Sequence, residues 1–527
     1  MKAGVIGLVI LGWAAEGTAA DWPMWGGTPA RNMVAAECGL PTDFGPIQFK
    51  GGGNEVDVGA TKHLKWVAKL GSQSYGNVVV AAGRVFVGTN NDPPRDPRHS
   101  GDRSILLCLD EHTGALLWQL VVPKLAAGQV NDWEQLGILS SPAVEGDRVY
   151  LVTSRAEVLC LDARGLANGN DGPFTNEAHY VVQDIVLDRG RPTERPAPPI
   201  EPGPRDADIL WCYDMIHELG VFPHNAANSA PLLYGDLVYV ATGNGRDWTH
   251  ANVPFPFAPS LIALDRRTGT LAATDDAGIG PRVFHGQWSS PAAGLVDGRP
   301  LLFYGGGDGW CYAFDARPAL SGGRAWLRTV WRFDCNPPHR KVREGRPLHY
   351  GDPAGPSEIN ATPVFVSNRV FVAVGQDPEQ GEGAGCLSCM DATRTGDITQ
   401  TGKVWAFDAI GRSLSTVAID AATGLLFTAD LAGVVYCLDA HSGTVFWTHD
   451  MKAQVWGSPL LADGKVYLGD ADGDWVVLAA TKQKTVLGET NLGAPIYSSP
   501  VAANGVLFVQ TCTHLFAFAL EQKSGGS

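Results

Sequence analysis

Short apolar runs alternate with turn residues along most of the chain, and they return in the same order. Each unit begins with a small or hydroxyl-bearing seed, such as Ser140-Ser141-Pro142-Ala143, followed by a Gly-bearing turn and a second apolar run. A third run ends in a small residue, an apolar residue and Asp, as in Cys108-Leu109-Asp110. Runs of this length between frequent turns predict antiparallel strands joined by hairpins.

The seed occurs eight times, and this number indicates the architecture. The other seven copies begin at Gly76, Ser229, Ser289, Ala361, Ser415, Ser458 and Ser498. The best units add a fourth run that carries Trp, as in Thr113-Gly114 to Trp118. Units of this size cannot bury an apolar face alone, so they stack. The pattern therefore predicts an all-β fold: an eight-bladed β-propeller of four-stranded antiparallel blades.

The two ends of the repeat region complement each other. The last unit, residues 498–520, supplies three strands without a Trp run, whereas residues 63–68 form a Trp run with no blade before them. Pairing the two closes the ring by an N-terminal strand and removes two free sheet edges. We therefore expect an N-terminal extension over residues 21–60, a single propeller over 61–520 and a tail over 521–527.

The first twenty residues have the pattern of a targeting segment. Met1-Lys2 precedes an apolar stretch over residues 3–15, which ends in small residues up to Ala20. The stretch is too short for an ordinary membrane-spanning helix. It predicts a signal peptide cleaved near Ala20 and a periplasmic or secreted protein whose mature chain has no transmembrane segment. A retained membrane anchor is the alternative.

Charge and cysteine usage narrow the picture further. The 527 residues carry a net charge of −15 and contain no basic run, which argues against nucleic acid as a partner. Four cysteines occupy the slot before Leu-Asp or Met-Asp where other units have alanine, so we predict them to be buried core residues: Cys108, Cys160, Cys389 and Cys437. A local disulfide between Cys386 and Cys389 stays open.

Candidate binding residues lie just before the seeds and in the turns between second and third strands. In a propeller these segments surround one end of the central funnel, where loops on a rigid scaffold commonly carry binding residues. Aromatic rings beside amides and carboxylates suit a planar or sugar-like ligand. The structural alternative is that Asp and Asn side chains in such turns only form hydrogen bonds with their own backbone. The candidates are His224, Asn225, Asn244, Arg246, Asp247, His285, Gln287, Trp288, Asp308, Trp310, Asn360, Gln376, Asp377 and Trp456.

The small-x-Asp, Thr-Gly-x-x-x-Trp pattern resembles the tryptophan-docking repeat of PQQ-type β-propellers over roughly residues 60–520. That superfamily includes quinoprotein alcohol dehydrogenases and the outer-membrane assembly factor BamB. The runs at residues 285–291, 307–310 and 376–379 are similar to those of uncharacterised secreted bacterial PQQ-like repeat proteins. The resemblance implies the propeller fold and says little about activity.

As a quinoprotein, the chain would bind PQQ and calcium, and the resemblance implies Glu157 and Asn244 as calcium ligands. Three positions differ from the family's functional residues and argue against a quinoprotein. Gly286 and Ser289 stand where the family has Asp, including the base, and Gly307 stands where a cationic residue is expected. Without a base, proton abstraction from an alcohol has no acceptor.

The sequence therefore predicts an exported binding or scaffold protein that holds a protein, glycan or small molecule on its funnel face. No cofactor or metal is expected, and no catalytic residue is assigned. Two alternatives remain: a divergent PQQ-dependent dehydrogenase, and a carbohydrate-active enzyme using the same funnel.

Overall fold

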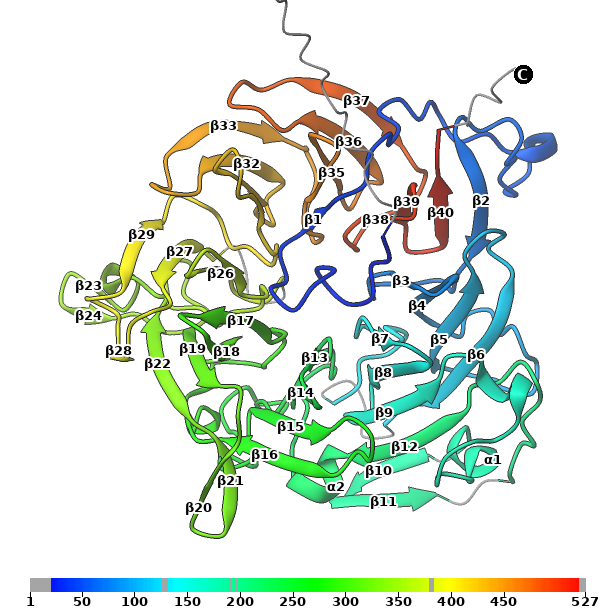
Figure 1. The fold of residues 1–527 in the computed structure, drawn as a ribbon, viewed down its shortest axis with the longest axis horizontal. Helices are drawn as coiled ribbons and strands as arrows, with labels where there is room; N and C mark the ends of the chain where they lie inside the picture. The colour runs from blue at the N-terminus through cyan, green and yellow to red at the C-terminus, as the bar shows by residue number, and fades with distance from the viewer. Residues whose placement is uncertain are drawn as a thin grey trace, which may run out of the picture.

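The computed structural model describes residues 20–125, 131–182, 184–188, 191–195, 198–378 and 383–520. Within them, eight antiparallel blades of four strands surround a central axis (Figure 1), so the predicted all-β propeller is confirmed. The predicted signal peptide falls outside the described residues except for Ala20. Helices are short: α1 (Glu177–Tyr180), α2 (Met215–Leu219), and the 3-10 turns Lys50–Gly52, Gly165–Asn168, Gly280–Arg282 and Pro338–Arg340.

The first four blades follow one another in the sequence, each from its innermost to its outermost strand. Blade 1 holds β3 (Val79–Ala81), β4 (Arg84–Asn90), β5 (Arg103–Asp110) and β6 (Leu116–Pro123). Blade 2 holds β7 (Ala143–Glu145), β8 (Arg148–Val152), β9 (Glu157–Asp162) and β12 (Ile209–Asp214). Blade 3 holds β13 (Leu232–Tyr234), β14 (Leu237–Ala241), β15 (Leu261–Asp265) and β16 (Leu271–Asp275). Blade 4 holds β17 (Ala292–Val296), β18 (Arg299–Gly305), β19 (Trp310–Asp315) and β22 (Thr329–Asp334).

The remaining blades repeat the same order. Blade 5 holds β25 (Val364–Val366), β26 (Arg369–Val374), β27 (Cys386–Asp391) and β29 (Lys403–Phe407). Blade 6 holds β30 (Ala418–Asp420), β31 (Leu425–Ala429), β32 (Val434–Asp439) and β33 (Val445–Asp450). Blade 7 holds β34 (Leu460–Ala462), β35 (Lys465–Gly469), β36 (Asp474–Ala479) and β37 (Val486–Asn491). Blade 8 holds β38 (Val501–Ala503), β39 (Val506–Gln510), β40 (His514–Phe518) and β2 (Leu64–Lys69).

Short accessory strands decorate the ring. They are β1 (Val34–Ala35), the hairpin β10 (Asp184–Asp188) with β11 (Arg191–Arg195), the hairpin β20 (Ala319–Ser321) with β21 (Arg324–Leu327), the hairpin β23 (Val342–Arg343) with β24 (Arg346–Pro347), and β28 (Gly396–Asp397). β21 extends blade 3 and β28 extends blade 4, each in parallel with the outermost strand.

The ring closes as the sequence predicts. β2 pairs antiparallel with β40, and Trp66 lies opposite Ala517. An N-terminal strand thus completes a blade whose other three strands come from the end of the repeat region. This pairing leaves β40 with neighbours on both sides.

The repeated Trp explains both the Thr-Gly turn and the small residue before Asp. In blade 1, Trp118 lies opposite Cys108 on the neighbouring strand, and its Nε1 donates to the carbonyl of Ala163 in blade 2. A Cβ on Gly114, of the Thr-Gly turn in blade 1, would lie 2.5 Å from the Trp66 ring of blade 8. A Cβ on Gly165, the corresponding residue of blade 2, would lie 2.8 Å from the Trp118 ring, so glycine lets the indole pack at both junctions. Five more tryptophans donate to a carbonyl of the next blade: Trp66, Trp211, Trp331, Trp405 and Trp447.

Two blades fill the tryptophan position differently. Blade 3 has Ala273 opposite Ala263, and the Tyr239 hydroxyl donates instead to the carbonyl of Ala316 in blade 4. Blade 7 has Gly488, which the backbone of Thr42 approaches so closely that a Cβ would lie 2.0 Å from its carbonyl oxygen. Phe44 covers this junction with edge contacts to Trp475 and Phe518.

The seed hydroxyls link neighbouring blades around the axis. The backbone N–H of Thr362 donates to Thr416 Oγ1, that of Thr416 to Ser458 Oγ, and that of Ser458 to Ser499 Oγ. The N–H of Ser499 then donates to Asn77 Oδ1 of blade 1. The recurrence of Ser or Thr in the seed therefore has a structural reason, because the hydroxyl satisfies a buried backbone group of the preceding blade.

Residues 20–35 cross the axis of the ring, which the sequence did not predict (Figure 1). We call this segment the axial plug. It bonds to the innermost strands of blades 1, 2, 4, 5, 6, 7 and 8 through backbone or amide groups. Arg31 supplies the contacts with the remaining blade, blade 3. Its fully buried guanidinium donates to the carbonyls of Trp25, Ala230, Pro231 and Pro291, of which Ala230 and Pro231 belong to blade 3.

The cysteines are all unpaired, and each lies among the described residues. Cys108, Cys160, Cys389 and Cys437 are buried, as predicted. The local disulfide left open for Cys386 and Cys389 does not form, because residues three apart on β27 point to opposite faces of the strand. In the described part of the chain, none of the helices is both long and apolar enough to cross a membrane.

Candidate functional site

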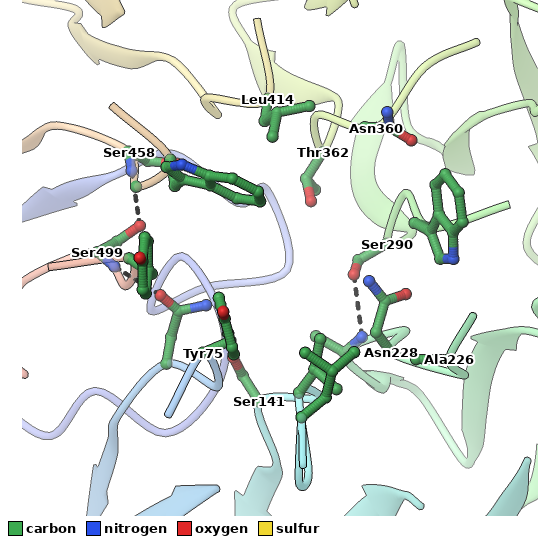
Figure 2. Close-up of a pocket in the computed structure, with 18 of the residues that line it drawn as sticks. Tyr75, Ser141, Ala226, Asn228, Ser290, Asn360, Thr362, Leu414, Ser458 and Ser499 are labelled. Carbon is green, nitrogen blue, oxygen red and sulfur yellow. Dashed lines mark hydrogen bonds between the residues drawn. The ribbon is translucent and has the colours of Figure 1, made fainter. Parts of the chain in front are cut away.

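A cavity of about 450 Å³ occupies the axis of the propeller, and we call it the funnel (Figure 2). Trp25 of the axial plug is one of its lining residues, so the plug closes one end of the channel. The walls come from the segments that precede each innermost strand. They include Tyr75, Ser141, Asn228, Ser290, Thr362, Thr416, Ser458 and Ser499.

Aromatic side chains gather on one side of the funnel. The rings of Tyr75 and Tyr497 stack with centroids 4.9 Å apart and planes 17° apart. Trp456 packs at the edge of Tyr497, with a centroid distance of 5.5 Å. Burial raises the pKa of Tyr75 to about 12, so its hydroxyl stays protonated and can donate a hydrogen bond. This group offers apolar faces and polar edges to a ligand.

Neutral polar groups line the rest of the wall. Asn225, Asn228 and Asn360 contribute amides, and Asn228 Oδ1 and Asn360 Oδ1 are buried without a hydrogen-bond partner. The lining carboxylates are Glu134 and Asp377, and none of the described lining residues is lysine or arginine. The funnel is therefore suited to a ligand that donates hydrogen bonds and carries little negative charge.

A buried acid lies behind the wall. Glu358 is fully buried, and its Oε1 accepts from the Tyr350 hydroxyl at 3.0 Å and from the backbone N–H of Asp377 at 3.0 Å. Burial is the largest cause that raises the pKa of Glu358 to about 8. The carboxyl is therefore mostly protonated at neutral pH, and it holds Asp377 in place at the edge of the funnel.

Five of the fourteen predicted site residues line the funnel: Asn225, Trp288, Asn360, Asp377 and Trp456. Four others are buried away from the lining, namely His224, Asn244, His285 and Gln287, and Gln376 is buried as well. Gln287 Nε2 donates to the carbonyl of Asn244, which ties this group together. Asp308 binds Arg282 and Tyr312, Arg246 and Asp247 lie in the loop after β14, and Trp310 begins β19. Ligand binding by any of the fourteen stays a prediction.

Some lining residues could not be predicted from the repeat. Trp25 belongs to the axial plug, and Trp133 and Glu134 lie in the insertion before the second seed. These positions occur once, so no repeat pointed to them. The hydroxyl just before the proline or valine of most seeds was recognisable as repeated, but its position on the wall follows only from the ring geometry.

The calcium ligands that the quinoprotein resemblance implies are already engaged. Glu157 forms a buried ion pair with Arg155, and its Oε2 accepts from the Tyr180 hydroxyl at 2.8 Å. Asn244 Oδ1 accepts from the N–H of Phe222, and its Nδ2 donates to the carbonyl of Phe255. Neither residue lines the funnel. These two side chains therefore do not fit the role of calcium ligands.

The glycines that replace the family's functional residues are required by packing. A Cβ on Gly286 would lie 2.4 Å from the Trp288 ring, and one on Gly307 would lie 2.4 Å from the carbonyl oxygen of Gly286. A base or a cationic side chain cannot be introduced at these positions without moving backbone or Trp288. A quinone bearing several carboxylates would also meet no lysine or arginine among the described lining residues.

Comparison with known proteins gives the same architecture. A family model described as outer membrane protein assembly factor BamB matches residues 50–167 and 394–487. No curated protein matches.

Three solved structures share the fold. BamB from Moraxella catarrhalis is 15% identical with a TM-score of 0.51, covering 86% of this chain and 98% of that one. A europium-containing methanol dehydrogenase is 14% identical with a TM-score of 0.54, covering 95% and 98%. The quinohemoprotein alcohol dehydrogenase ADHIIG from Pseudomonas putida HK5 is 11% identical with a TM-score of 0.53, covering 96% and 81%. At these identities the likeness concerns the fold alone. With its eight blades and docking tryptophans, the chain is an eight-bladed β-propeller, and its repeats are similar to those of BamB and of the propellers of quinoprotein dehydrogenases.

Proposed function

We propose that the protein is a binding protein that holds a neutral, hydroxyl-rich ligand such as a glycan in the funnel. The observation that carries this proposal is the composition of the wall. Stacked tyrosines and Trp456 line the same cavity as Asn228 and Asn360, whose buried amide oxygens have no hydrogen-bond partner among the described residues. Sugar rings combine an apolar face with outward hydroxyl donors, which is the complement of this surface.

The resemblance to an outer-membrane assembly factor supports the export predicted from the sequence, and we extend the proposal to a periplasmic or secreted location. It also supports a protein partner as the alternative occupant of the funnel face. The dehydrogenase alternative finds less support, because the implied calcium ligands are engaged elsewhere.

The test is a binding screen with the full chain. Isothermal titration with neutral oligosaccharides of the cello-, chito- and malto- series should yield saturable binding to the wild-type protein. Trp456→Ala should weaken it at least tenfold because it removes an aromatic face. Trp248→Ala is the matched control, since Trp248 is 75% exposed and does not line the funnel. Stabilisation by PQQ with calcium, and alcohol-driven reduction of a dye, would instead support the dehydrogenase. Equal saccharide binding by both variants would contradict the proposal.

A further inference from the structure

Three histidines meet behind Trp288: His224 precedes blade 3, His250 lies on the loop between its second and third strands, and His285 lies on the loop to blade 4. The ring centroids of His224 and His285 lie 4.3 Å apart, and His250 lies 5.1 Å from the first and 4.7 Å from the second. One potential ligand atom from each residue lies within 4.8 Å of one from each of the others. They lie far apart in sequence and share no repeat position.

Hydrogen bonds fix the tautomers of the two buried rings. His224 Nδ1 lies 2.7 Å from the carbonyl oxygen of Arg246, which can only accept, so this nitrogen carries the proton. His285 Nδ1 lies 3.1 Å from the Tyr350 hydroxyl, whose own proton goes to Glu358 Oε1. That hydroxyl oxygen therefore accepts from His285 Nδ1. In both rings Nε2 is left with a free lone pair.

Those two lone pairs have no partner among the described residues. His224 and His285 are both 0% exposed, and both Nε2 atoms are buried without a hydrogen bond. An unpaired buried acceptor costs free energy unless a water or an ion satisfies it.

The third histidine is held near the pair by an ordered loop. The Arg246 guanidinium donates to the carbonyl oxygens of Val283 and His250. Asp247 accepts from Thr249 and Asn252, which fixes the turn that carries His250. His250 itself is exposed, so its ring can adjust its position.

We propose that His224, His250 and His285 form a binding site for a divalent transition-metal ion such as Zn²⁺. Neutral imidazoles suit these ions, whereas calcium and magnesium take oxygen ligands. Metal–nitrogen distances of about 2.0–2.1 Å place tetrahedral ligand nitrogens about 3.4 Å apart. The three ligand atoms already lie within 4.8 Å of one another, so ion binding requires them to draw closer, and the exposed His250 ring is able to move. The Nδ1 hydrogen bonds to Arg246 and Tyr350 are the outer contacts that orient metal-binding histidines.

The site adjoins the funnel through Trp288. This indole donates from Nε1 to the carbonyl of His224, packs edge-on against His285 at 5.2 Å, and lines the funnel. Three protein ligands leave a fourth position of a tetrahedral ion for water or a ligand atom. The site is independent of the proposed saccharide binding, since its ligands are not lining residues.

The test uses the full, untagged chain after chelator treatment. Titration with ZnCl₂ should show one equivalent bound per chain, and Co²⁺ should give the visible absorption of a tetrahedral nitrogen site. His250→Ala should weaken Zn²⁺ binding at least tenfold without loss of folding, because His250 is exposed. His285→Gln should do the same, with far-UV circular dichroism as the check on its fold.

His441→Ala is the matched control, because His441 is exposed and lies on blade 6, away from the cluster. It should bind Zn²⁺ as the wild type does. Absence of stoichiometric Zn²⁺ and Co²⁺ binding would overturn the proposal. So would a folded His250→Ala variant with wild-type affinity.

Discussion

Trp118 and Trp456 show two uses of the same side chain. Trp118 is 1% exposed, lies opposite Cys108, and donates to a carbonyl of the next blade. Trp456 is half-buried, contacts Tyr497 at the funnel, and donates only to the nearby Gln454 side chain. The first occupies the position at which tryptophan recurs in six blades, whereas the second precedes a seed, where the other blades have Tyr, Leu, Asn or, in blade 4, Trp288.

This difference distinguishes residues that stabilise the scaffold from residues that are available to contact a ligand. A residue that recurs once per blade serves the junction between blades, because that junction is what recurs. A residue that does not follow the repeat is not needed at these junctions, so it can contact a ligand. Substitutions at the two kinds of position test this division.

Trp118→Ala should lower the free energy of unfolding by about 3–5 kcal/mol, because it removes a buried indole and its interblade hydrogen bond. Chemical denaturation followed by circular dichroism measures this. A loss below about 1 kcal/mol would show that the junction does not depend on this ring.

Glu358→Gln tests the buried acid behind the funnel through its pH dependence. The folded-state pKa of about 8 exceeds the ordinary value of 4.5, so the unfolded chain ionises first as pH rises. Wild-type stability should therefore fall between pH 4.5 and 8, and the Gln variant should lack this component. The free energy of unfolding of the variant should rise relative to that of the wild type across that window, and the two should be equal below pH 4.5. Glu201→Gln, at an exposed site, is the control and should show no such gain.

Gly114→Ala and Gly146→Ala test the glycine against which a docking tryptophan packs at the junction between blades. Both glycines have positive φ, 71° and 61°, so both substitutions bear a similar backbone cost. Only at Gly114 would the new Cβ collide with a ring, 2.5 Å from Trp66 Cε3, whereas Gly146 has open space. Gly114→Ala should be less stable than Gly146→Ala by about 1–3 kcal/mol. Equal melting temperatures would contradict the role assigned to the glycine.

Trp456→Ala should change the free energy of unfolding by less than about 1 kcal/mol, because the ring is half-buried and outside the junctions. Thermal denaturation beside Trp118→Ala provides the comparison. A loss as large as that of Trp118→Ala would erase the proposed division between the two tryptophans.

The repeat explains how much of the molecule the sequence could predict. Strand number, blade number and ring closure followed from positions that recur, such as the seed hydroxyls and the Thr-Gly turn. The funnel was predictable in outline, since Asn225, Trp288, Asn360, Asp377 and Trp456 all line it. Propeller geometry places any residue just before an innermost strand near the axis.

The remaining features depend on contacts that occur once. Nothing in residues 20–35 has a strand period, so their path across the axis was not predictable. His250 comes from a long loop, and its approach to His224 and His285 follows from tertiary packing alone. His224 and His285 were predicted as site residues from their positions before the seeds, but their burial and their contact with each other could not be predicted from the sequence.

The axial plug also constrains how the chain can fold. Its contacts join residues near position 20 to Asn504, and β2 pairs with β40 near position 515. Such contacts span almost the whole chain, and loop-closure entropy must be overcome before they contribute. Neither can form until the last blade has been synthesised. The eight blades therefore reach their native arrangement only when both ends of the chain are present together, so ring closure is a late step in folding.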